Sequence, residues 1–104
     1  MRSPQLTVGR RVIGEMVRLA AVGVPGVLRV GRAGPAWRAL LHGPPISTSV
    51  HGGRVDVRVV VVARPGHPLG PLATQVQSSV GAAIERLLGL ELGTVTVLVD
   101  GVGS

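Results

Sequence analysis

The sequence contains no cysteine, no lysine, no tyrosine and no phenylalanine, and it has a single tryptophan. Without cysteine there is no disulfide, no thiolate metal site and no cysteine nucleophile. Small secreted domains more often depend on disulfides, so a reducing, cytoplasmic location is expected. With almost no aromatic residues, the hydrophobic 45% of the chain must build its core from aliphatic side chains.

Long hydrophobic runs are also missing. The longest uninterrupted one, Val59 to Ala63, is five residues, whereas about 20 are needed to cross a bilayer. The N-terminus shows no hydrophobic core of a signal peptide. We therefore expect no direct membrane insertion, and any place at the inner face of the membrane would depend on a protein partner.

Acidic residues are few: 11 basic residues, all arginine, stand against five acids, which gives a formal charge of +6. Such a charge attracts acidic proteins, anionic lipids or nucleic acid. The arginines are scattered, however, with Arg10-Arg11 as the only adjacent pair. No polybasic tail and no set of stacking aromatics is present, which disfavours nucleic acid as the partner.

Twenty valines and two amphipathic stretches define the expected elements. The patterns predict helices over 10–22 and 72–88, strands over 27–30 and 94–99, and a central hairpin with strands over 47–50 and 54–63. The hairpin turn is 51–53, where glycines supply positive φ. The order predicts an α+β two-layer sandwich, with two helices packed on one face of a small mixed β-sheet. One domain is expected over 1–104.

Residues 31–46 interrupt this pattern with two Pro/Gly clusters around one or two possible helical turns, so they predict an exposed excursion. It contains the only aromatic residue, Trp37. An aromatic residue next to arginine and leucine is typical of an interface anchor. A second interpretation is that Trp37 closes the open edge of the core. The candidate partner-binding residues of the excursion are Arg32, Trp37, Arg38, Leu40 and Leu41.

Arg54 and Arg58 are two further candidate partner-binding residues, on the polar face of the strand 54–63. Asp56 lies between them, so charge balance within the strand is the competing interpretation. Gly31-Arg32-Ala33-Gly34 spells the G-x-x-G of a KH-type loop, which clamps single-stranded nucleic acid between two helices. Here the motif follows a strand. A structural turn is therefore favoured, and a KH-like nucleic-acid-binding module remains the alternative function.

No arrangement of residues points to catalysis. The three histidines, His42, His51 and His67, fall in separate predicted loops, and no pair has the spacing of a metal site. The serines lack the context of an activated nucleophile. The carboxylates are predicted to be solvated, not buried as an acid/base pair requires. We expect a protein that is not an enzyme and needs no cofactor.

Four stretches together resemble the alkaline shock protein family of bacterial envelope-stress proteins. They are Leu19 to Val27, Gly53 to Val61, Gln77 to Leu92 and Val95 to Val102. Each is apolar patterning with a glycine, and the resemblance comes from their order and spacing. It implies a cytoplasmic interaction or scaffold protein without known catalytic residues. It also implies self-association and a protein partner, which in some relatives is a small membrane-anchored protein at the inner face of the membrane.

Overall fold

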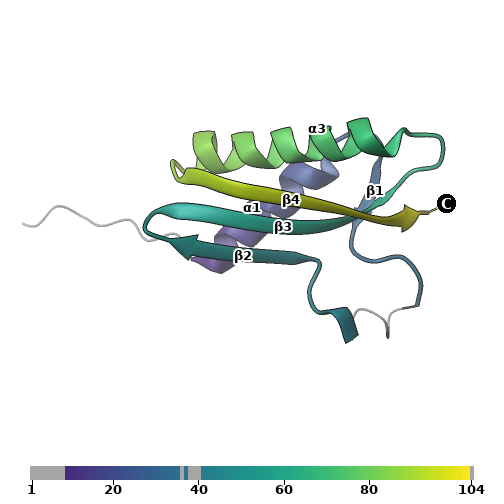
Figure 1. Cartoon of the computed structure of the whole chain (residues 1–104), viewed down its shortest axis with the longest axis horizontal. Coiled ribbons are helices and arrows are strands. Elements are labelled where there is room, and N and C mark those ends of the chain that lie inside the picture. The colour runs from purple at the N-terminus through teal and green to yellow at the C-terminus, as the bar shows by residue number, and fades with distance from the viewer. Residues whose placement is uncertain (1–8, 36, 38–40, 104) are drawn as a thin grey trace, which may run out of the picture.

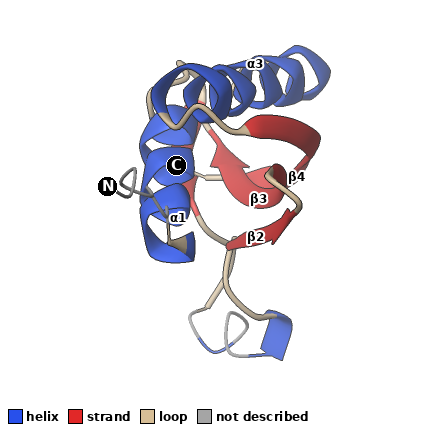
Figure 2. Cartoon of the chain, turned by 90° about the vertical axis from the view of Figure 1, so that its left-hand side faces the viewer, coloured by secondary structure: helices blue, strands red, loops and turns tan. Residues whose placement is uncertain are grey.

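The computed structural model describes residues 9–35, 37 and 41–103. Helices α1 and α3 lie on the same face of a β-sheet (Figures 1 and 2), which confirms the predicted α+β two-layer fold. In chain order the elements are α1 (Arg10–Val22), β1 (Val27–Val30), β2 (Ile46–His51), β3 (Arg54–Ala63), α3 (Leu69–Ala82), the π-helical turn η1 (Ala83–Leu87) and β4 (Glu91–Val102).

β3 is the central strand, and the sheet around it is mixed, as predicted. β4 runs parallel to β3 on one side, and the crossover between them contains α3. β1 and β2 both pair antiparallel with β3 on its other side. The predicted hairpin turn forms between β2 and β3, where Gly52 and Gly53 have φ of 56° and 79°. It is one residue shorter than predicted, because His51 belongs to β2 and pairs with Arg54.

β1 and β2 act as one edge strand with an insertion in its middle. β1 pairs with Val61 to Ala63, and β2 pairs with Arg54 to Val59. Val60 lies between these two stretches and joins them, because its carbonyl accepts a hydrogen bond from Gly31 N and its amide donates to Pro45 O. The excursion therefore leaves the sheet and returns to it at the same residue of β3.

The core lies between the helices and β3. Alternate residues of β3 point toward the helical layer because side chains alternate across a strand. They meet residues spaced three and four apart on α1 and α3, where helical side chains share a face. The largest fully buried side chains of this cluster are Ile13, Val17, Val55, Val59, Val61, Val76, Val80 and Ile84.

The C-terminal half of β3 is buried on both faces, as the unbroken valine run predicted. Val60 and Val62, on the face away from the helices, are at most 1% exposed. Gly103 lies against Val62 and Leu28, since a Cβ on Gly103 would meet both side chains. Pro44 and Pro45 lie beside Val60 at the return of the excursion. The face opposite the helices is thus covered at one end and open at the other.

Three elements have bounds that differ from the predicted ones. β2 spans Ile46–His51 and is one residue longer at each end than the predicted 47–50. The second helix begins at Leu69, not Leu72, because Pro71 is tolerated anywhere in a first turn whose N–H groups have no helical partner. β4 spans Glu91–Val102 and not only 94–99, since two bulges keep it paired with β3 beyond the alternating segment.

Candidate interaction surfaces

Arg32 closes the base of the excursion. Its Nη2 donates a hydrogen bond of 2.9 Å to the carbonyl of His42, which lies near the other end of the segment. Ala33 N donates to Asp100 Oδ2 of β4 at 3.0 Å. The G-x-x-G motif is therefore a turn after β1 that is bonded to the sheet, as the structural interpretation predicted. Arg32 thus holds the two ends of the excursion together through the bond from its side chain to the backbone of His42.

Besides Arg32, the structure describes two further candidates of the excursion, Trp37 and Leu41, and both are exposed. Trp37 is 60% exposed and Leu41 is 70% exposed. Neither belongs to the core cluster, which disfavours Trp37 as a cover for the edge of the core. That Trp37 anchors a partner stays a prediction. Arg38 and Leu40 lie outside the described residues.

Arg54 is at the hairpin end of β3 and is not free. Its guanidinium donates to Glu91 Oε1 of the neighbouring parallel strand at 3.2 Å. Both side chains are exposed, and ion pairs of this kind contribute about 0 to 1 kcal/mol. The partner of Arg54 is thus a glutamate across the sheet and not Asp56, which sequence reasoning placed beside it.

Arg58 is exposed on the open face of the sheet. It lies with Arg32 around one small hollow of about 150 Å³, which also includes Ser47 and His42. The structure therefore brings together two of the predicted candidates, and it places Arg54 at the other end of the polar half of β3. Of the remaining candidates, Trp37 and Leu41 are exposed on the excursion.

Asp56 stabilises a bulge in β4 and does not balance the strand arginines. Its Oδ1 accepts a hydrogen bond of 2.7 Å from Thr94 N. This bond lies where β4 places two residues, Gly93 and Thr94, opposite one residue of β3. A glycine is required at 93 because a Cβ there would collide with Asp56 Oδ1 and with Arg54 Cγ.

We expect Asp56→Ala to lower the free energy of unfolding by about 1.5 to 3 kcal/mol, the range for hydrogen bonds to charged groups. Asp56→Asn keeps an acceptor and should cost less than half as much. Urea denaturation of both variants measures the difference. Equal losses would show that the charge of Asp56, and not the bond to Thr94, stabilises this end of the sheet.

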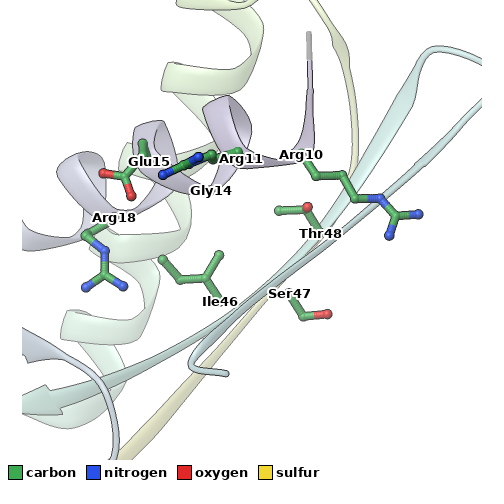
Figure 3. A pocket seen from close by; sticks show the side chains of 8 residues that line it. All are labelled: Arg10, Arg11, Gly14, Glu15, Arg18, Ile46, Ser47 and Thr48. Carbon is green, nitrogen blue, oxygen red and sulfur yellow. The ribbon is translucent and has the colours of Figure 1, made fainter. Parts of the chain in front are cut away.

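A basic groove between α1 and β2 was missed at the level of sequence. Figure 3 shows Arg10, Arg11 and Arg18 of α1 above Ile46, Ser47 and Thr48 of β2, around a space of about 410 Å³. Glu15 is the one acid that lines it, so three positive charges and one negative charge leave a net of two positive. Within the described residues Glu15 makes no ion pair.

An apolar hollow lies between α1 and η1 on the helical layer. It has a volume of about 350 Å³, and Ala20, Ala82, Ala83 and Leu87 contribute to its lining. Leu87 is 67% exposed at its rim. Ser79 and Arg86 complete the lining.

The residues that the structure describes show no metal site. They contain no group of three His, Asp or Glu side chains able to hold a metal ion. His42 is at the base of the excursion, His51 is hydrogen-bonded to Ser49, and His67 lies against Gly26. No described helix is both long and apolar enough to span a membrane.

Solved structures with the same arrangement define the fold class. A MamM CTD variant in a copper form has a TM-score of 0.59 at 15% identity, covering 89% of this chain and 98% of that chain. A variant in a nickel form has a TM-score of 0.57 at 15% identity, covering 88% and 96%. At this identity the likeness concerns the fold alone. No curated protein matches the chain.

The family follows from the sequence as a whole. Residues 2–104 match the model of the alkaline shock protein 23 family, which is described as having a cell envelope-related function. The chain belongs to this family, and the resemblance seen in the four sequence stretches is confirmed. The match also includes residues 31–46, so the excursion lies inside the family domain.

Proposed function

We propose that this protein is a non-catalytic interaction module of the cell envelope, which works in the cytoplasm at the inner face of the membrane through protein partners and through self-association. Membership of an envelope-related family supports the setting. The apolar hollow supports the mode of action, because it is the kind of surface that a second protein covers. A small membrane-anchored protein is one partner that would place the module at the membrane.

The apolar hollow is the proposed surface for self-association. Each copy has a formal charge of +6, so two copies repel each other over most of their surface. At the hollow, Arg86 is the one charged residue of the lining. Burial of Leu87 and the alanines between two copies supplies the attraction, at roughly 25 cal/mol per Å² of apolar surface.

We expect Leu87→Glu to weaken self-association at least tenfold. The change places a carboxylate in the interface, where its desolvation opposes association. Sedimentation equilibrium over a concentration series measures it. Association of the parent protein should strengthen as salt rises, because screening removes the repulsion between the two positively charged copies.

Leu41→Glu is the matched control, since Leu41 is equally exposed but belongs to the excursion. It makes the same change of charge and should leave association within twofold of the parent. If Leu41→Glu dissociates the protein and Leu87→Glu does not, the copies meet through the excursion. A parent protein that stays monomeric at every concentration would contradict self-association.

A further inference from the structure

The outer edge of β2 has open backbone groups. Val60 directs its N–H and C=O toward Pro45 and Gly31, on the side of the edge strand. Backbone groups in a strand alternate in direction, so Arg58 and Asp56 direct theirs to the same side, against Ser47 and Ser49. The intervening residues of β2 therefore direct theirs outward. In the described part of the chain no other strand pairs with this edge.

The basic groove runs along this edge. In Figure 3, Arg10 and Arg18 lie at opposite ends of it, with Thr48 and Ile46 of β2 along the floor between them. The first and third turns of α1 thus place guanidinium groups beside a strand edge that is ready to form hydrogen bonds, while the turn between them contributes Glu15. These two features suit one kind of ligand, which is extended and carries negative charge.

We propose that β2 binds an extended acidic segment of a partner protein, which adds to the sheet as a further strand. The segment forms main-chain hydrogen bonds with the outward N–H and C=O groups of Ile46, Thr48 and Val50. Its carboxylates face the arginines of α1. Arginine binds carboxylates with two parallel hydrogen bonds, so it favours this pairing over a neutral strand. The inference rests on the proposed function and names the partner class of one surface.

A second copy of this chain does not fit the groove. Pairing two β2 edges about a twofold axis brings the α1 arginines of both copies near each other, and the groove already has an excess of two positive charges. The apolar hollow on the helical layer has no such penalty. The two surfaces therefore bind different partners. The hollow binds a second copy of the chain, and the groove binds an acidic strand.

Nucleic acid fits the groove less well than an acidic strand. Single-stranded nucleic acid is held by aromatic stacking together with basic residues. No aromatic residue lines this groove, and the outward backbone groups offer pairing that a peptide satisfies and a phosphate backbone does not.

The probe is a fluorescein-labelled ten-residue peptide in which Glu alternates with Thr, titrated with full-length protein at 150 mM salt and followed by anisotropy. We expect saturable binding that is at least tenfold weaker for the peptide with Gln in place of Glu. The same acidic peptide with N-methyl groups at alternate residues cannot donate along one edge. It should lose at least tenfold in affinity, although its charge is unchanged.

Two protein variants place the binding in the groove. Arg11→Glu combined with Arg18→Glu should weaken peptide binding at least tenfold, because both side chains belong to the groove lining. Arg64 lies outside the groove, and Arg64→Glu also replaces a positive charge by a negative one. This variant should alter the affinity for the peptide less than twofold. Circular dichroism confirms that the variants are folded.

Three outcomes overturn the inference. They are binding that survives N-methylation of the peptide, equal effects of the groove variants and Arg64→Glu, and stronger binding to a labelled dT12 oligonucleotide than to the acidic peptide. Failure of this inference is distinct from failure of the proposed function. In the first case Leu87→Glu still changes self-association, while in the second it does not.

Discussion

Val57→Asp is expected to unfold the protein at room temperature. Val57 is 3% exposed in the centre of β3, between Thr48 of β2 and Val95 of β4. An aspartate there buries a carboxylate without a partner, because the described core contains no polar or charged side chain. The cost is of the same order as the whole stability of a domain of this size, about 5 to 15 kcal/mol. Near-complete loss of the thermal unfolding transition should be seen by circular dichroism.

Arg58→Asp is the control for this variant. Arg58 is the next residue of the same strand, and it is exposed on the open face of the sheet. An aspartate at that position stays in water and should lower the melting temperature by only a few degrees. If the two variants melt at similar temperatures, the faces of β3 are assigned the wrong way round.

Gly26→Ala is expected to have the second largest effect. Gly26 follows Pro25 in the turn before β1 and has φ of 99°, a conformation that costs other residues about 1 to 3 kcal/mol. A Cβ there would also lie 2.7 Å from His67 Nδ1 and 3.1 Å from Leu72 Cδ1. The carbonyl of Gly26 accepts a hydrogen bond from Arg64 N, so the turn has little freedom to shift. We expect a loss of about 3 kcal/mol or more in urea denaturation.

Gly66→Ala separates the two causes. Gly66 has a similar φ of 84°, but no atom lies within 4 Å of the position that its Cβ would take. This variant should show only the backbone cost, so the difference between the two losses measures the collision with His67 and Leu72. Equal losses would mean that the side chains around Gly26 move aside freely.

The layers of the fold were predictable because their residues follow simple periods. Alternating valines define one buried face of β3, and apolar residues spaced three and four apart define one buried face of α1. These two apolar faces pack against each other. The parallel crossover to β4 also followed, since a helix between two strands returns the chain in the same direction. The start of β4 was not predictable, because the bulge at Gly93 depends on a hydrogen bond that Asp56, which is distant in sequence, accepts from Thr94 N.

The candidate surfaces were predicted only in part, because they combine segments that are far apart in the chain. Arg32 and Arg58 were singled out one by one, and their meeting around one hollow depends on the excursion returning at Val60. The basic groove was missed for a similar reason. The Arg10-Arg11 pair was visible in the sequence. The groove also requires the edge of β2, and the pattern along one helix does not show which strand lies beside it.

Because the edge strand is interrupted at the excursion, the excursion can change during evolution without a change in the core. Both ends of the segment are fixed at Val60, so a longer or shorter segment leaves the strand register and the packed valines unchanged. Loop-closure entropy rises slowly with length, by about 0.6 kcal/mol for each doubling. Relatives can therefore exchange residues 31–45 for other lengths and sequences at little cost in stability, and a chimera that carries a foreign segment there should fold on the same sheet.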